Sequence, residues 1–193
     1  PLVPVDETAR AMQQLYRQGK IRAIGVSNYS LKQMDIFRQA ASLHVVQPPY
    51  NIFERHIEHD VLPYVHKHTL KTLTYGALCR GLLTGRMKPD TQFTGDDLRK
   101  VDPKFQQPRY GQYLDAVAQL ERFARERFKK SVLALAVRWL LDQPDVSIAL
   151  WGARRPDQLD PVDEAMGWTI DDMSRKAIDQ IVHKTIKDPV GPE

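Results

Sequence analysis

Polar or aromatic residues stand directly after three short apolar segments of this sequence. The residues are Ser27, Asn28, Gln47 and Tyr75. Hydroxyl and amide groups can donate and accept hydrogen bonds, and the flat face of a tyrosine can stack on another ring. Such residues at the ends of parallel strands could hold a planar polar ligand. On the residues alone, Ser27 and Asn28 are better explained as the start of a turn, and Gln47 as a partner for the backbone. For Tyr75 the alternative is a core residue.

A second group of residues suits an anion. Gly76 permits a close approach of the backbone, so the amides near Gly76 and Leu78 could meet a phosphate. The guanidinium of Arg80 can bind phosphate oxygens in pairs, which makes it the strongest charged candidate. Gly152 precedes a segment in which we expect a helix, whose N-terminus can hold an anion. Arg154 follows it, although exposed arginines are common in any loop.

The histidines and the cysteine suggest no reactive centre. His56, His59, His66 and His68 fall around one expected helix, where we interpret them as solvent-facing polar residues. His56 and His59 could touch one metal ion, but no third ligand is suggested, so we expect no metal site. We expect Cys79 to be a buried small residue and not a nucleophile. A single cysteine cannot form an internal disulfide, which fits a reducing compartment.

Composition is that of a globular protein. Of 193 residues, 42% are hydrophobic and 27% charged, which argues against disorder and permits one domain. The net charge of +4 is spread along the chain, which gives no support for nucleic-acid binding. No apolar run approaches the roughly 18–20 residues of a membrane span, and no leader pattern opens the chain. We therefore expect a soluble, cytoplasmic protein.

Helices and strands are expected to alternate. Apolar residues at helical spacing predict helices, and short β-branched runs predict buried strands. Ser30 is expected to cap the second helix, and Asp171 or Thr169 the last. Residues 87–109 show no clear period and suggest an excursion at the mouth of an active site, or a lid. The expected helices cover residues 8–19, 31–37, 57–68, 113–128, 132–141, 157–166 and 171–186, and the strands cover 21–26, 45–47, 70–75 and 146–151.

This alternation requires a parallel sheet, because parallel neighbours cannot be joined by a hairpin. Four such strands could form an open doubly wound sheet or half of an eight-stranded barrel. An open dinucleotide-binding sheet would carry Gly-x-Gly-x-x-Gly after its first strand, and residues 25–30 (GVSNYS) do not match that pattern. The barrel is therefore favoured.

Four motifs in order resemble the aldo-keto reductase family. They are residues 19–28 (GKIRAIGVSN), 47–51 (QPPYN), 75–85 (YGALCRGLLTG) and 152–159 (GARRPDQL). The resemblance covers nearly the whole chain and is closest to bacterial members acting on small aldehydes, ketones or polyols. It implies an NAD(P)H-dependent oxidoreductase with a (β/α)8 TIM barrel.

The resemblance implies that residues 1–193 form the C-terminal half of that barrel, with strands five to eight. The N-terminal half, which in the family carries the catalytic Asp, Tyr, Lys and His, would be absent. We therefore expect no catalytic residue in this chain, no activity of the chain alone, and a need for the other half or for self-association. The alternatives are a non-catalytic nucleotide-binding or regulatory subunit and, more remotely, a half-barrel that assembles with a partner.

The resemblance also assigns cofactor contacts. It places a nicotinamide carboxamide against Ser27, Asn28 and Gln47, and the ring against Tyr75. Arg154, with Arg155 a weaker candidate, would meet a 2′-phosphate, which favours NADP while leaving NAD open. Val162, after Pro161, stands where many relatives have an asparagine against the adenine, so adenine contacts are in doubt. The resemblance further implies that the pyrophosphate meets Gly76, Leu78, Arg80 and Gly152, and that Gln158 contacts the adenosine. Trp151 and residues 87–109 are candidates to line a substrate pocket.

Overall fold

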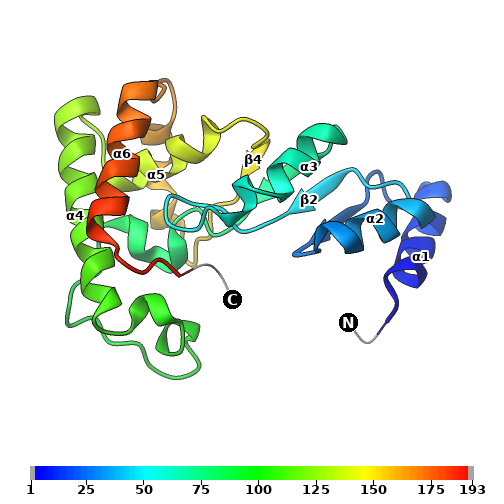
Figure 1. Cartoon of the computed structure of the whole chain (residues 1–193), viewed down its shortest axis with the longest axis horizontal. Helices are drawn as coiled ribbons and strands as arrows, with labels where there is room; N and C mark the ends of the chain where they lie inside the picture. Colours follow the sequence, from blue (N-terminus) through cyan, green and yellow to red (C-terminus); the bar gives the residue numbers. More distant parts are fainter. Residues whose placement is uncertain (1–2, 191–193) are drawn as a thin grey trace. The chain divides into compact units, whose positions relative to one another are not determined.

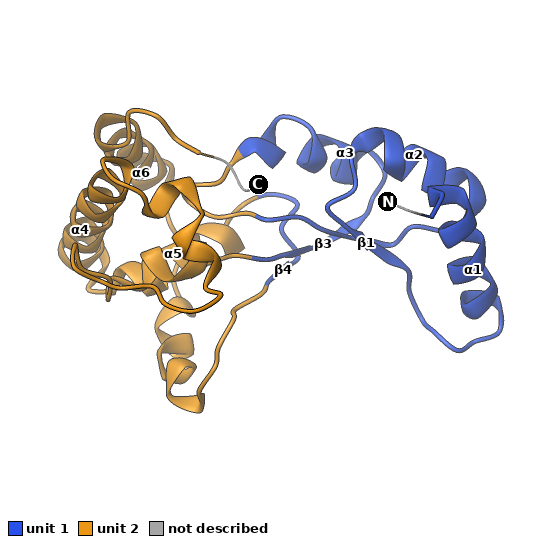
Figure 2. Cartoon of the chain, turned by 90° about the horizontal axis from the view of Figure 1, so that it is seen from below, with its two compact units in different colours: residues 1–49, 56–75, 144–149 blue, residues 50–55, 76–143, 150–193 orange. Residues whose placement is uncertain are grey.

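The computed structural model describes residues 3–190, which fall into two compact units (Figure 2). Unit 1 contains residues 1–49, 56–75 and 144–149, and unit 2 contains residues 50–55, 76–143 and 150–193. The four strands all belong to unit 1, and the three longest helices of the C-terminal part belong to unit 2. Figure 1 follows the chain from its N-terminal part (blue) to its C-terminal part (red). Within residues 3–190, no helix combines the length and the apolar character needed to cross a membrane.

The sheet of unit 1 is parallel throughout, which confirms the predicted alternation. Its order is β1 (Gly25–Ser27), β2 (Val45–Gln47), β3 (Lys71–Thr74) and β4 (Ile148–Ala149). The first and last strands are shorter than expected. We also expected the last strand to be buried, yet Ile148 is 50% exposed, because β4 lies at a sheet edge with a single neighbouring strand.

Helices α1 (Val5–Arg17), α2 (Leu31–Ala40) and α3 (Val61–Lys67) complete unit 1. Ser30 caps α2 as predicted: its Oγ accepts from the amide of Gln33, and its own amide donates to Gln33 Oε1 at 2.8 Å. The expected helix over residues 57–68 divides into a short 3-10 turn, η1 (His56–Glu58), and α3. The core of this unit includes Ile24, Met34, Phe37, Val46 and Val65.

Unit 2 is built on α4 (Arg109–Phe128), α5 (Val132–Leu141) and α6 (Asp172–Thr185). Helix α5 is buried on almost every side, and its Trp139 is only 1% exposed. Asp171, and not Thr169, caps α6, because its carboxylate accepts from the amide of Ser174 at 2.8 Å.

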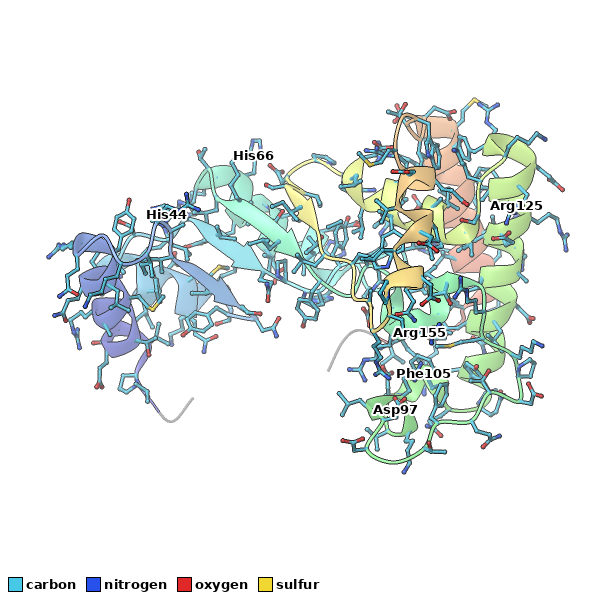
Figure 3. The ribbon with its side chains drawn as sticks, turned by 180° about the vertical axis from the view of Figure 1, so that it is seen from behind. His44, His66, Asp97, Phe105, Arg125 and Arg155 are labelled. Carbon is cyan, nitrogen blue, oxygen red and sulfur yellow. The ribbon has the colours of Figure 1, made fainter. Side chains whose placement is uncertain are left out.

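Short 3-10 turns occur in three segments of unit 2. The expected helix over residues 157–166 is wrong: the segment forms η5 (Pro156–Gln158) and η6 (Asp160–Ala165), because Pro161 lacks an amide hydrogen for a longer helix. Residues 76–85 contain η2 (Cys79–Thr84). The 87–109 excursion contains η3 (Leu98–Lys100) and η4 (Pro103–Phe105). It packs through the rings of Phe93, Phe105 and Tyr110; Phe105 is labelled in Figure 3.

Candidate functional site

Unit 1 brings together four of the predicted residues at the carboxyl ends of β1, β2 and β3. Ser27 and Gln47 are paired in register, and Ser27 Oγ donates to the carbonyl of Gln47 at 3.0 Å. Tyr75 follows β3, and its hydroxyl donates to Asn28 Oδ1 at 3.1 Å. Ser27 and Asn28 are exposed, whereas Gln47 and Tyr75 are half-buried. We call these four residues the amide cluster.

The amide cluster retains free hydrogen-bonding groups. Asn28 has a φ of 57°, a left-handed conformation that asparagine tolerates better than most residues. Nothing within residues 3–190 hydrogen-bonds to Nδ2 of Asn28 or to the side-chain amide of Gln47. The Nδ2 donor of Asn28 and the whole side-chain amide of Gln47 therefore lie at the same strand ends. Together they offer the hydrogen-bond donors and the acceptor that a planar carboxamide can pair with.

Three of the predicted anion contacts lie together at the start of unit 2. We call residues 76–81 the phosphate turn. Cys79, Arg80 and Gly81 have φ values of 45°, 51° and 97°, so three successive residues are left-handed. The amide of Cys79 donates to the carbonyl of Gly76, and that of Gly81 to the carbonyl of Leu78, each at 2.8 Å. The amides of Gly76 and Leu78 have no hydrogen-bond acceptor among the described residues.

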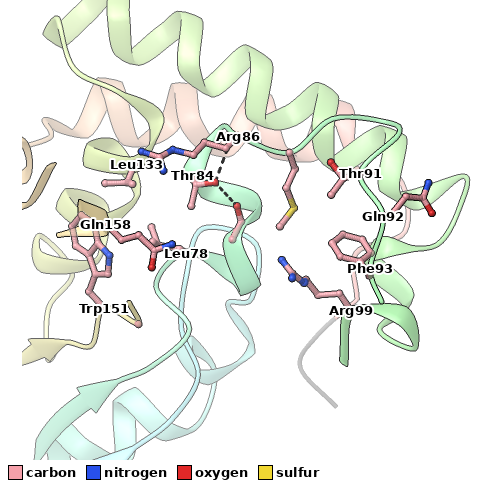
Figure 4. A pocket seen from close by; sticks show the side chains of 13 residues that line it. Leu78, Thr84, Arg86, Thr91, Gln92, Phe93, Arg99, Leu133, Trp151 and Gln158 are labelled. Carbon is pink, nitrogen blue, oxygen red and sulfur yellow. Dashed lines mark hydrogen bonds between the residues drawn. The ribbon is translucent and has the colours of Figure 1, made fainter. Parts of the chain in front are cut away.

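A cavity of about 270 Å³ lies in unit 2 (Figure 4). It includes Leu78, Gly152, Gln158 and Trp151 from the predictions, whereas Gly76, Arg80 and Arg154 do not line it. Two cations also line the cavity: Arg99 belongs to the 87–109 excursion that was expected to line a pocket, whereas Arg86 precedes this excursion and was not predicted. The lining residues are Leu78, Gly81, Thr84, Arg86, Met87, Thr91, Gln92, Phe93, Arg99, Leu133, Trp151, Gly152 and Gln158.

Gln158 organises the turn that carries the two predicted arginines. Its Oε1 accepts from the amides of Arg154 at 2.7 Å and Arg155 at 3.3 Å. The Arg155 guanidinium donates twice to Asp157, each time at 3.0 Å, and these bonds lower the pKa of Asp157. Arg154 forms no ion pair with any described residue. Of the two arginines, Arg154 is therefore the one left for a ligand.

The expected helix N-terminus after Gly152 is not present. The segment that follows is η5, a single 3-10 turn of three residues. A helix needs several aligned peptide units to concentrate positive charge at its start. Any anion in this part of unit 2 must therefore be held by side chains and individual amides.

The sequence analysis also missed a buried set of charges. Lys104 is 1% exposed, and its Nζ lies 2.9 Å from Glu54 Oε1 and 3.1 Å from Asp102 Oδ1. Asp102 Oδ2 lies 3.3 Å from Nη1 of Arg80. We call Glu54, Lys104, Asp102 and Arg80 the charge network. Asn51, which belongs to the second motif, donates from Nδ2 to Glu54 and to the carbonyl of Gly76 at 3.0 Å.

Charges in this network keep Lys104 ionised. Burial alone would lower the pKa of Lys104, but hydrogen bonds and attraction from Glu54 and Asp102 outweigh burial and raise it. Cys79 is 1% exposed, as predicted, and burial raises its thiol pKa well above the ordinary value. Its thiol therefore stays protonated, which does not favour a nucleophile. No three His, Cys, Asp or Glu side chains among residues 3–190 are grouped so that they could hold a metal ion.

Comparisons with known proteins agree on one family. The sequence profile of the Aldo/keto reductase family matches residues 1–183. Aldo-keto reductase YhdN of Bacillus subtilis is 58% identical over 193 residues, which are 100% of this chain and 58% of that protein. NADH-specific methylglyoxal reductase of Escherichia coli is 31% identical over 156 residues, 81% of this chain and 47% of that protein. The structure of glycerol dehydrogenase AKR11B4 from Gluconobacter oxydans matches with a TM-score of 0.91 and 54% identity, over 99% of this chain and 58% of that one. The chain thus spans about half the length of the relatives that it matches.

Proposed function

Because the chain belongs to the aldo-keto reductase family, oxidoreductases with a (β/α)8 barrel fold, we propose that it supplies the cofactor-holding part of an NADP-dependent carbonyl reductase. The observation that carries this proposal is the amide cluster at the carboxyl ends of β1, β2 and β3. Active sites of barrel enzymes lie at the carboxyl ends of the strands. The substrates would be small aldehydes, ketones or the corresponding alcohols.

In this proposal the amide cluster orients a nicotinamide ring. The chemistry supplied by NADPH, when bound there, would be hydride transfer to a carbonyl carbon. Asn28 Nδ2 and the Gln47 amide offer the donors and the acceptor that a carboxamide requires. The Tyr75 hydroxyl donates to Asn28, which limits movement of the side chain as a whole, and the tyrosine ring would stack on the nicotinamide. With the ring fixed, only one of its faces would meet the substrate.

Unit 2, taken by itself, suits the phosphates of a dinucleotide. The free amides of Gly76 and Leu78 and the Arg80 guanidinium would hold the pyrophosphate. Arg99, at the wall of the cavity, is fixed by Asp97, and bonds from Arg99 hold the pKa of Asp97 far below its usual range. The arginine is thereby pre-organised. The donors present therefore fit an anionic dinucleotide.

The chain would provide strands five to eight of the barrel. Support comes from the four parallel strands with two open edges, β1 and β4, and from the 58% of YhdN and of AKR11B4 that the chain spans. A proton donor for the carbonyl oxygen would come from the remaining strands. We propose a cytoplasmic location for the assembled enzyme.

We expect the chain by itself to show no NADPH-dependent turnover of small aldehydes, whereas a complete barrel containing it turns them over. Cofactor positioning cannot replace a general acid. The measurement is loss of NADPH absorbance with a panel of aldehydes, using the complete barrel as the positive control. Turnover by the chain alone that disappears when one of its own residues is changed would contradict this assignment.

Arg154→Ala should weaken NADPH binding more than NADH binding in the complete barrel. The expected difference is about 1–3 kcal/mol, the range for hydrogen bonds to charged groups. Arg155→Ala is the matched control, because Arg155 is already paired with Asp157. Calorimetric titration of both nucleotides measures the effect. Equal losses for NADPH and NADH would show that Arg154 does not read the 2′-phosphate, and would point to the NADH preference that the E. coli relative's name states.

A further inference from the structure

The charge network joins the 87–109 excursion to the phosphate turn. Lys104 lies between Glu54 and Asp102, and all three are buried. Only Arg80, with 38% of its side chain exposed, reaches the surface. Asp102 Oδ2 has no hydrogen-bond partner with good geometry in residues 3–190; its contact is the ion pair with Arg80 at 3.3 Å. The buried carboxylate of Asp102 thus contacts the guanidinium of Arg80 from the protein interior.

The charges of the network balance only when Arg80 is counted. Glu54 and Asp102 contribute two negative charges, and Lys104 compensates one of them. Arg80 compensates the other, which ties its guanidinium to Asp102, since an unpaired buried carboxylate is costly. A guanidinium has five N–H donors. The contact with Asp102 uses one nitrogen and leaves the others for a ligand.

The excursion also holds the backbone of Arg80. Arg99 Nη1 lies 3.4 Å from the Arg80 carbonyl oxygen and donates to it. The left-handed φ values of Cys79 and Arg80 are unfavourable for residues with a Cβ and persist only where the surroundings impose them. Asp102 and Arg99, from one segment, therefore constrain both the side chain and the main chain of Arg80.

We propose that Asp102, supported by Lys104 and Glu54, is a positioning residue that presents the Arg80 guanidinium to a phosphate-bearing ligand. The inference rests on the proposed function for the identity of that ligand. Asp102 does not touch the ligand. It fixes the direction of the planar donor group, so part of the cofactor affinity is set by the excursion.

The test is a double-mutant cycle in a complete barrel that contains this chain. Dissociation constants for NADPH and for inorganic pyrophosphate are measured by calorimetry for wild type, Arg80→Ala, Asp102→Asn and the double variant. We expect Arg80→Ala to weaken both ligands roughly 30-fold and Asp102→Asn about 5-fold. The double variant should bind no more weakly than Arg80→Ala, because Asp102 acts through that residue.

Asp142→Asn is the matched control. Asp142 is a carboxylate with 8% side-chain exposure in unit 2, paired with Arg138 at 2.7 Å. If it weakens pyrophosphate as much as Asp102→Asn, or if the cycle is additive, the positioning role is overturned while the proposed function stands. If Arg80→Ala binds as tightly as wild type, Arg80 does not meet the ligand and the inference alone is overturned. If wild type binds no NADPH, the proposed function fails and the inference with it.

Should Asp102→Asn fail to fold, Arg80→Lys provides an independent test at a partly exposed position. Lysine keeps the positive charge but cannot present several N–H donors in one plane. We expect nearly the same loss as for Arg80→Ala. Wild-type affinity in Arg80→Lys would show that direction does not matter and would overturn the inference.

Discussion

Replacing Lys104 by alanine is expected to lower the free energy of unfolding by about 3–5 kcal/mol, the cost of removing one partner from a buried ion pair. Lys104 contacts Glu54 and Asp102, and all three residues are less than a tenth exposed. Without the ammonium group, two carboxylates face each other in a buried site with one cation fewer. Total stabilities of about 5–15 kcal/mol leave little margin for such a loss.

Urea denaturation of the complete barrel measures this change. Lys100→Ala is the control, since Lys100 is exposed and, among residues 3–190, its ammonium group donates only to the carbonyl of Gly95. Lys104 has its pKa raised in the folded protein above the ordinary lysine value of 10.5. Its contribution is therefore fully present at neutral pH and disappears only as the pH rises through the raised value. A loss below about 1 kcal/mol, typical of a surface pair, would contradict the buried-network account.

The isolated chain is expected to form dimers, larger species or aggregates. A closed barrel has no edges, whereas this sheet ends in β1 and β4, each with one strand neighbour. Unpaired strand groups invite pairing with another chain. Neither edge strand contains a proline or a charged residue that would block an added strand. Their residues are Gly25–Ser27 in β1 and Ile148–Ala149 in β4.

Sedimentation velocity across a range of concentrations measures the association. Addition of the remaining barrel strands as a separate chain should shift the population toward a single defined species, because both edges would then be paired. A well-folded monomer with a cooperative melt in the isolated chain would refute the half-barrel assignment. It would favour an open sheet.

Local patterns determined the elements of this protein. Apolar spacing located the helices, and the Ser30 and Asp171 caps are set by hydrogen bonds within one turn. The consecutive motifs identified the family because each is short and contiguous. Boundaries were less certain at β1 and β4, since the length of a strand depends on how far its neighbours extend alongside it. Pro161 interrupts the expected helix over residues 157–166, which forms 3-10 turns instead because proline lacks an amide hydrogen.

Only the tertiary structure decided which residues share a site. Sequence motifs placed Ser27, Asn28, Gln47 and Tyr75 at strand ends, but parallel pairing is what brings the Tyr75 hydroxyl to Asn28, 47 residues away. In the charge network, Glu54 pairs with Lys104, which comes from a distant segment of the chain. No repeating sequence pattern links these two segments. Buried ion pairs depend on distance in space and on exclusion of water. A sequence lists the charges of this protein, and the packing of residues distant in the chain determines which of them meet.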